Sequence, residues 1–182
     1  MKPSTTHPIF AGTVLALLLV SPAISQDPET IASTVSDITW RHIGPVNMGG
    51  RVSAIVGIPG DPKTFWVGGA DGGVWKTTNG GTTFDPQWQD EDAYSVGALA
   101  VAPSDQNVIW LGSGEGDPRN SVSYGLGVWR STDGGSTWKH LGLRDTERIK
   151  RIVVDPRDPD VALVCALGHA WGPNEERGVF KT

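Results

Sequence analysis

The sequence lacks several features that mark common protein classes. It has one cysteine in 182 residues, so no disulfide can form within the chain. It has no lysine- or arginine-rich run and a net charge of −5, so the electrostatic footprint of a nucleic-acid-binding protein is missing. Its N-terminal apolar run, from Ile9 to Val20, is shorter than the span of about 20 residues that crosses a bilayer. The sequence therefore predicts no nucleic-acid partner and no membrane span.

Phenylalanine and tyrosine are scarce, whereas glycine, proline and tryptophan are not. The chain has 24 glycines, 13 prolines and 8 tryptophans, against 4 phenylalanines and 2 tyrosines. Glycine and proline at such frequency argue against long helices. Eight indoles argue against a disordered chain, which buries little apolar surface. The glycines have no three-residue period, which excludes collagen. A turn-rich all-β protein remains.

Residues 1–25 have the pattern of a secretory signal peptide. Lys2 precedes the apolar run, and Ala23-Ile24-Ser25 offers small residues at the cleavage positions. We therefore expect the mature chain to start at Gln26 and to be exported, to the periplasm or the extracellular space. Residues 26–39 then form a polar linker before the folded part.

The rest of the chain repeats itself. The stretches "VSAIVGIPGDPKTFWVG", "VGALAVAPSDQNVIWLG" and "IKRIVVDPRDPDVALVC" start at residues 52, 96 and 149. Each pairs two apolar strands across a turn with proline. Further on, "GVWKT", "GVWRS" and "GVFKT" start at Gly73, Gly127 and Gly178, spaced 54 and 51 residues apart. A period near 50 built of short strands is typical of β-propeller blades.

Two octapeptides follow the first two of these segments, "TTNGGTTF" at 77–84 and "STDGGSTW" at 131–138. The Asp133 carboxylate can accept N–H groups of its own turn, and the glycines supply positive φ values. Asn79 can make the same bonds, so we predict structural rather than catalytic roles for both. The predicted structural residues are Thr77, Asn79, Gly81, Thr83, Phe84, Ser131, Asp133, Gly135, Thr137 and Trp138.

These octapeptides resemble the Asp-box, or bacterial neuraminidase, repeat. The stretches "WRHIGPVNMGGRVSAI", "GGVWKTTNGGTTF", "GSGEGDPRNSVSYGLGVWRSTDGGSTWKH" and "ALGHAWGPNEERGVFKT" are similar to secreted proteins with a sortilin-type propeller, often labelled glycosyl hydrolases. The resemblance covers residues 40–182. It implies an all-β propeller of four-stranded Asp-box blades, with about two and a half blades here and further blades after Thr182. It also implies a peptide or protein ligand.

We name the four strands of each repeat A to D, in order from the propeller channel outward. In the second repeat we place A at 96–101, B at 108–111 and C at 128–131, with D starting at Trp138. The B–C and D–A connections then share one end of the blades. The B–C connections differ in length, at 68–72, 112–127 and 166–177, and variable loops on a rigid scaffold usually carry binding residues. The predicted ligand-binding residues are Asp71, Glu115, Arg119, Asn120, His169, Trp171, Glu175 and Arg177.

Three functions remain open: a binding module for peptide, protein or glycan, a glycoside hydrolase, and a structural scaffold. For the hydrolase, Asp71 is the catalytic candidate. Its setting, "GADGGVWK", is similar to the "TDVGGAYR" segment of propeller xyloglucan hydrolases, although one residue between Asp and Gly-Gly is missing. A sialidase would carry an "RIP" segment, which is absent. We predict no cofactor and no metal, because His169 has no second histidine at helical spacing.

Burial can also be predicted from the repeat. Trp66 and Trp110 occupy matching positions in strand B, and Trp75 and Trp129 match in strand C. We expect all four indoles to be buried between blades. Cys165, between Val164 and Ala166, is predicted to be a buried strand residue.

Overall fold

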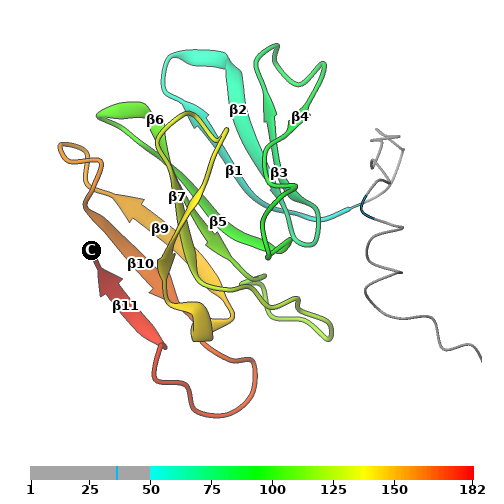
Figure 1. Ribbon diagram of the computed structural model, residues 1–182, viewed down its shortest axis with the longest axis vertical. Coiled ribbons are helices and arrows are strands. Elements are labelled where there is room, and N and C mark those ends of the chain that lie inside the picture. The colour runs from blue at the N-terminus through cyan, green and yellow to red at the C-terminus, as the bar shows by residue number, and fades with distance from the viewer. Residues whose placement is uncertain (1–35, 37–49) are drawn as a thin grey trace, which may run out of the picture. The chain divides into compact units, whose positions relative to one another are not determined.

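The computed structural model describes Ser36 and residues 50–182 (Figure 1). The predicted signal peptide, the linker apart from Ser36, and the first ten residues of the predicted propeller lie outside the described residues. Residues 50–182 contain eleven strands and one helical turn. These are β1 (Val52–Ile58), β2 (Asp61–Gly69), β3 (Gly73–Thr77), β4 (Asp85–Pro86), β5 (Val96–Ala102), β6 (Asp105–Ser113), β7 (Val128–Ser131), β8 (Lys139–Gly142), η1 (Arg144–Thr146), β9 (Ile149–Val154), β10 (Ala162–Ala166) and β11 (Gly178–Lys181).

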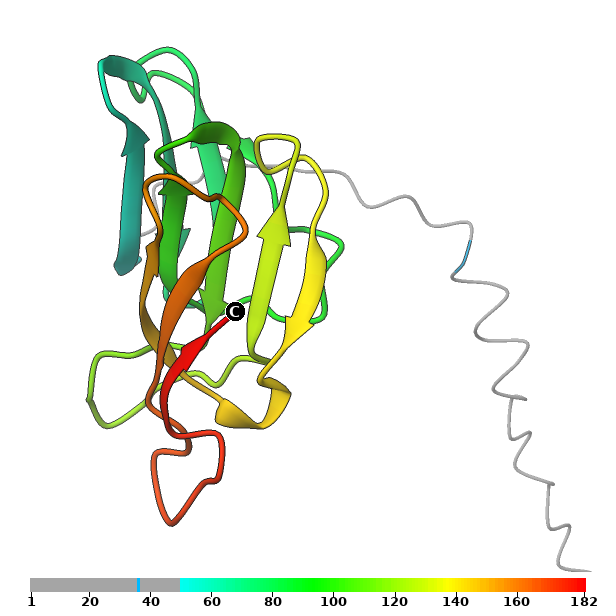
Figure 2. The same ribbon diagram turned by 90° about the vertical axis from the view of Figure 1, so that its left-hand side faces the viewer.

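The strands form three antiparallel sheets in chain order. The first blade is β1-β2-β3-β4, the second is β5-β6-β7-β8, and the third contributes β9, β10 and β11. The first strands of successive sheets lie side by side, since β5 contacts both β1 and β9 (Figures 1 and 2). Two four-stranded blades and three strands of a third confirm the predicted all-β propeller architecture. No helix in the described part of the chain is long and apolar enough to cross a membrane.

Aromatic side chains fill the space between the blades. Between the first and second blades, Trp88 lies edge-on to Trp129 and Trp138, with ring centroids 5.2 and 5.1 Å apart. Between the second and third blades, Trp110 packs with Ile149 and the other buried residues of that cluster. Buried indoles contribute large apolar areas, so these residues hold neighbouring blades together.

Three of the four predicted tryptophan burials are confirmed. Trp66 and Trp110 are 1% exposed and Trp129 is 3% exposed. The prediction for Trp75 is wrong, because this residue is only half-buried. Strand register places it on the same side of the first blade as Ile55, which is itself exposed. The matching side of the second blade, with Trp129, packs against the first blade.

The predicted burial of Cys165 is also wrong. Cys165 is half-buried in β10. It pairs with Val179 of β11, which is 68% exposed, so both lie on one side of the third sheet. Val164, the next residue along β10, is on the other side and packs into the cluster with the second blade. A strand buried on one face only therefore leaves the thiol on the open side.

Glycine permits the close approach of the innermost strands. A Cβ on Gly97 would lie 2.1 Å from the carbonyl oxygen of Gly114. A Cβ on Gly112 would lie 2.3 Å from Cγ2 of Ile149 in the next blade. These positions admit no side chain without movement of backbone or core. The absence of side chains at Gly97 and Gly112 lets β5 approach the backbone at Gly114 and lets β6 contact β9 of the next blade.

Candidate functional site at the loop end of the blades

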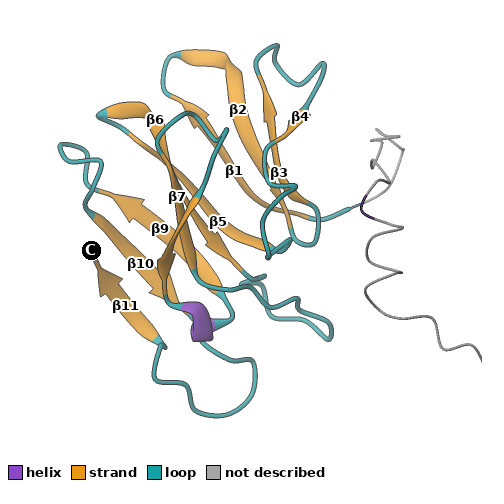
Figure 3. Ribbon diagram, viewed as in Figure 1, coloured by secondary structure: helices purple, strands orange, loops and turns teal. Residues whose placement is uncertain are grey.

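The two ends of the blades carry different connections. We call one the turn end, made of the A–B turns and the two C–D turns at 77–84 and 131–138. The other is the loop end, made of the B–C connections at 70–72, 114–127 and 167–177 and the D–A connections at 87–95 and 143–148. Both views place the two longer B–C connections at the same end (Figures 1 and 2). The helical turn η1, purple in Figure 3, belongs to the second D–A connection.

At the turn end, the side chains of Ser131, Asp133 and Thr137 bond to one another within the 131–138 segment. Asp133 Oδ1 accepts the Ser131 hydroxyl at 2.7 Å and the Thr137 N–H at 2.9 Å. Its Oδ2 accepts the Thr137 hydroxyl at 2.6 Å. Burial acts to raise the pKa of Asp133, but hydrogen bonds, those from Thr137 foremost, outweigh it and lower the pKa to about 2. Asp133 therefore serves its own turn.

The 77–84 segment reproduces this arrangement with an amide. Asn79 Oδ1 accepts the Thr77 hydroxyl at 3.0 Å and the Thr83 N–H at 2.9 Å. One bond is reversed, since Asn79 Nδ2 donates to the Thr83 hydroxyl oxygen at 2.8 Å. Gly81 and Gly135, at matching positions, have φ values of 87° and 93°. These geometries agree with the expected turn chemistry, and the assignment to the Asp-box family stays a prediction.

The last residue of each octapeptide packs differently. Trp138 donates Nε1–H to the Gln87 carbonyl at 2.8 Å and so ties the second blade to the first. Phe84 instead lies edge-on to Phe65 within the first blade, with centroids 5.9 Å apart.

At the loop end, main-chain hydrogen bonds join the connections to one another. Each bond links a B–C connection, or a residue beside it, to a D–A connection or its flank. The four bonds are Gly73 N to Tyr94 O (2.8 Å), Gly114 N to Ser95 O (2.9 Å), Gly125 N to Glu147 O (2.6 Å) and Leu167 N to Arg148 O (2.8 Å). The loop end is thus one continuous layer of connections from the first blade to the third.

A partly buried ion pair links the first and second blades in this layer. Arg51, just before β1, donates Nε–H to Glu115 Oε1 at 2.9 Å and Nη2–H to Oε2 at 2.6 Å. The Glu115 side chain is 2% exposed and that of Arg51 is 41% exposed. Asp71 Oδ2 lies 3.9 Å from the same Nη2. One guanidinium therefore holds carboxylates from the first and second B–C connections.

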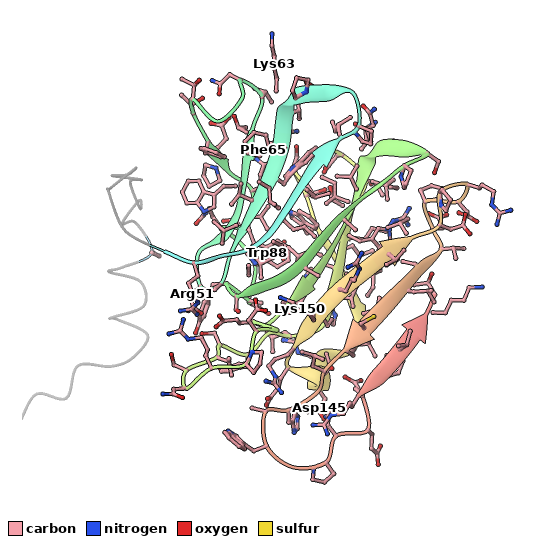
Figure 4. All side chains as sticks on the ribbon, turned by 180° about the vertical axis from the view of Figure 1, so that it is seen from behind. Arg51, Lys63, Phe65, Trp88, Asp145 and Lys150 are labelled. Atoms are coloured by element: carbon pink, nitrogen blue, oxygen red, sulfur yellow. The ribbon has the colours of Figure 1, made fainter. Side chains whose placement is uncertain are left out.

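A second, exposed ion pair joins the second B–C connection to the loop end of the third sheet. Lys150 of β9 places Nζ 2.5 Å from Asp117 Oδ1. Figure 4 shows Arg51 and Lys150 at the same end of the strands, with Asp145 beyond Lys150. The second B–C connection is therefore tied to the first blade by Glu115 and to the third by Asp117.

Arg177 braces the third B–C connection from within. Its Nε donates to the Leu167 carbonyl at 2.8 Å, and its Nη2 donates to the carbonyls of His169 at 2.9 Å and Gly172 at 3.2 Å. Two of the guanidinium nitrogens are thereby committed to the loop. Arg177 was predicted to contact ligand, and in the structure these donors shape the loop that carries Trp171.

The same connection is also tied to the D–A connection before it. Asn174 Nδ2 donates to Asp145 Oδ2 at 3.1 Å, and the Asp145 N–H donates to Glu176 Oε2 at 2.8 Å. His169 Nε2 lies 3.6 Å from Asp145 Oδ1 and 3.7 Å from Glu147 Oε1. Four acidic or amide side chains thus hold the base of the loop in place.

The remaining predicted residues are exposed at the loop tips. Arg119 and Asn120 lie at the exposed tip of the second B–C connection, and Glu175 and Trp171 are exposed on the third. Asp71 and Glu115 meet at Arg51, whereas no contact joins them to Trp171 within the described residues. Sequence reasoning missed Arg51 and Lys150. Their positions in the sequence could have identified them, because each lies at or beside the start of an A strand and therefore at the loop end.

Two cavities lie outside the B–C connections, and one of them is lined by the first D–A connection. One, of about 180 Å³, is lined by Arg130, Trp138 and Leu141 among others, and the other, of about 130 Å³, runs along 86–91 beside Ser136 and Trp138. Neither is lined by residues of the second or third B–C connection. In the part of the chain that the structure describes, no three His, Cys, Asp or Glu side chains are grouped as metal ligands.

Comparison with known proteins finds solved structures of similar fold and no match in sequence families. No family model and no curated protein matches the sequence. An ancestral GH74 enzyme is similar at 24% identity and a TM-score of 0.55, covering 72% of this chain and 17% of that one. The GH74 enzyme of Niastella koreensis is similar at 22% identity and 0.47, covering 62% and 17%. YCF48 bound to D1 peptide is similar at 16% and 0.49, covering 73% and 38%.

The ancestral GH74 enzyme is a β-propeller protein, in agreement with the sheets described above. The chain spans 17% of the length of each GH74 enzyme that it matches. At such identities the likeness establishes architecture, and propellers host many unrelated functions. The functional argument therefore rests on the loop end.

Proposed function

We propose that the protein is an exported β-propeller binding module that captures a peptide, protein or glycan ligand at its loop end. The observation that carries this proposal is the continuous loop layer. Its connections differ in length from blade to blade, yet main-chain bonds join each to the next. A surface that varies over a rigid scaffold is the usual place for ligand contacts.

The exposure of side chains on the B–C connections also supports a binding site at the loop end. Arg119, Asn120, Trp171 and Glu175 are exposed on connections whose bases are held by Arg51–Glu115 and by Arg177. Braced loops lose little freedom when a ligand binds, so their contacts yield more net affinity. The C–D turns lack this property, because Asp133 and Asn79 use their polar atoms within the turn.

The test exchanges the two loop tips for glycine and serine. Residues 117–121 and 170–173 are replaced in the full protein, which leaves Glu115 and Arg177 in place. Binding is then measured on immobilised peptide and glycan collections. We expect loss of ligand capture with little change in melting temperature. The control is Lys63→Ala with Arg157→Ala at the turn end, which should bind as the wild type does. Capture that survives the tip exchange, or that falls equally in the control, would refute this location.

A glycoside hydrolase is the second candidate, and the pair of carboxylates on Arg51 favours it. Glycosidases need two carboxyl groups close to one another, and Asp71 and Glu115 both approach Nη2 of Arg51. Asp71 is half exposed and can face a sugar, whereas Glu115 is 2% exposed and both of its carboxylate oxygens accept hydrogen bonds from Arg51. Glu115 is therefore closed to a substrate, which makes hydrolysis the weaker candidate.

Asp71→Asn distinguishes this candidate. If Asp71 is catalytic, the substitution should lower hydrolysis of xyloglucan or sialosides by several orders of magnitude and preserve substrate binding. Asp117→Asn, at the same end, is the matched control and should retain turnover. A wild-type protein that captures ligand and hydrolyses neither glycan would exclude this candidate.

A further inference from the structure

Trp171 is an uncovered indole on a braced loop. It is 90% exposed, the most exposed large apolar side chain among the described residues. Arg177 donates to the carbonyl of the adjacent Gly172 and so fixes the segment that carries the ring. An indole offers contact area and a hydrogen-bond donor, and such residues dominate binding energy at interfaces. Trp171 therefore has the setting of an anchor rather than of a core residue.

Two tyrosines lie on the neighbouring connections. Tyr124 is 64% exposed and Tyr94 is 60% exposed. Each adjoins one member of the hydrogen bond from the Ser95 hydroxyl to the Ser123 carbonyl, at 3.4 Å. That bond brings the segments of the two tyrosines together. The second B–C connection and the first D–A connection thus present two aromatic rings at the same end as Trp171.

Charge distinguishes the two ends of the blades. The loop-end connections and the starts of the A strands carry ten carboxylates: Asp71, Asp90, Glu91, Asp92, Glu115, Asp117, Asp145, Glu147, Glu175 and Glu176. They carry six basic groups: Arg51, Arg119, Arg144, Arg148, Lys150 and Arg177. The remaining seven acids and seven bases of residues 50–182 balance each other. The whole negative excess of this part of the chain therefore belongs to the loop end.

The negative charge at the loop end affects the pKa of one carboxyl group. Burial, and then the charges of Asp92 and Asp90, raise the pKa of Glu91 above its ordinary value. A cation bound nearby would relieve that repulsion.

We infer that the ligand of the loop end is a cationic polypeptide segment, whose lysine or arginine side chains lie over the exposed rings and between the carboxylates. This inference rests on the proposed function. Aromatic faces attract cations, more strongly where water is excluded, and the surplus carboxylates supply the opposite charge. A neutral glycan would use the rings and leave the net negative charge uncompensated, and an anionic ligand would be repelled.

The test uses labelled nona-arginine and nona-glutamate peptides with the full protein. Fluorescence anisotropy at low and physiological salt measures both affinities. We expect binding of nona-arginine alone. Trp171→Ala with Tyr124→Ala should weaken it by about tenfold or more. The aromatic control, Phe84→Ala at the turn end, should stay within about twofold of wild type. Melting curves verify that each variant folds.

A second pair of variants separates local charge from total charge. Asp90→Asn with Glu175→Gln removes two charges at the loop end, and Asp85→Asn with Asp158→Asn removes two at the turn end. We expect the first to weaken nona-arginine binding several-fold more than the second at physiological salt, because interactions between exposed charges are then largely screened beyond about 8 Å. Equal losses in the two variants would overturn the inference.

Three further results would overturn it in distinguishable ways. If the loop tips capture uncharged peptide or glycan but not nona-arginine, the ligand class is wrong and the proposed function stands. If the loop tips capture no ligand of any kind, the proposed function fails together with this inference. Binding of nona-glutamate as tight as that of nona-arginine would contradict the charge argument alone.

Discussion

The C–D turns and the loop-end connections are carried by the same strands, yet their acidic side chains differ in the range of their hydrogen bonds. In the turn at 131–138, Asp133 bonds to Ser131 and Thr137, two and four residues away. At the loop end, Arg51 bonds to Glu115 across 64 residues and Lys150 to Asp117 across 33. A turn that satisfies itself can be repeated in every blade. A layer held by long-range bonds can change from blade to blade, which suits a binding surface.

The largest loss of stability should come from disrupting the packing between blades, which supports both the turn end and the loop end. Trp129 is 3% exposed and packs edge-on to Trp88 between the first two blades. Trp129→Ala should lower the free energy of unfolding by about 3–5 kcal/mol, because it leaves a cavity. Denaturant titration measures this. Trp171→Ala is the matched control, since that indole is in water, and should stay within about 0.5 kcal/mol. Comparable losses in the two variants would contradict the assignment of Trp171 as an exposed anchor.

The next effect should be confined to the loop end. Glu115→Gln keeps the shape of the side chain but removes the anion that pairs with Arg51. We expect a loss of about 1–3 kcal/mol from the free energy of unfolding, at the lower end because Arg51 is 41% exposed and can be hydrated. Amide hydrogen exchange should accelerate in 114–127 and not in 131–138.

Asp117→Asn is the control for this variant. It removes a pair whose members are 41% and 57% exposed, so it should cost about 0–1 kcal/mol. If it costs as much as Glu115→Gln, burial does not distinguish the two ion pairs. If Glu115→Gln accelerates exchange equally at both ends, the loop layer is not an independent unit.

A smaller effect should be confined to one turn. Asp133→Ala removes the acceptor of the Thr137 N–H and hydroxyl, at a cost of about 1 kcal/mol, because the turn is exposed and water can replace the bonds. Asn79→Ala should cost about the same, since the first turn has the same acceptor geometry. Thermal unfolding compares the two. Loss of ligand capture by Asp133→Ala with an unchanged melting temperature would show that Asp133 has a role beyond its turn.

The same contrast explains what could be predicted from the sequence. The strands and the bonding of Asp133 follow from patterns within about ten residues, and the pairing of strands into blades follows from a repeat with a period near 50 residues, so all three were accessible before the structure. The burial of Trp129 followed from its match to a repeat position. Trp75 shares that position and differs, because burial depends on which blade lies against a face and not on the local sequence.

The loop end was predicted only as a location. Variable length identified the B–C connections, but no local pattern shows that Glu115 pairs with Arg51 or that Arg177 bonds to three carbonyls of its own loop. The Arg51–Glu115 pair depends on the packing of separate blades, and the Arg177 bonds depend on how the third B–C connection folds back on itself. The sequence therefore predicts Arg177 as a ligand contact, although two of its nitrogens are used inside the protein.

The smallest effect should be a difference in acid sensitivity between the two turns. Asp133 has a pKa of about 2, below its ordinary 3.8, because its hydrogen bonds with Thr137 and Ser131 outweigh the effect of burial. Its contribution to stability is therefore complete above the unfolded-state pKa and is lost as pH falls from about 4 towards 2. Asp133→Asn should flatten the pH dependence of the unfolding free energy in that window, because an amide does not titrate. Asn79→Asp should steepen it, because it gives the first turn the carboxylate of the second. Denaturant titrations at several pH values between 2 and 5 measure both slopes. A slope unchanged in both variants would show that these two turns do not contribute to acid unfolding.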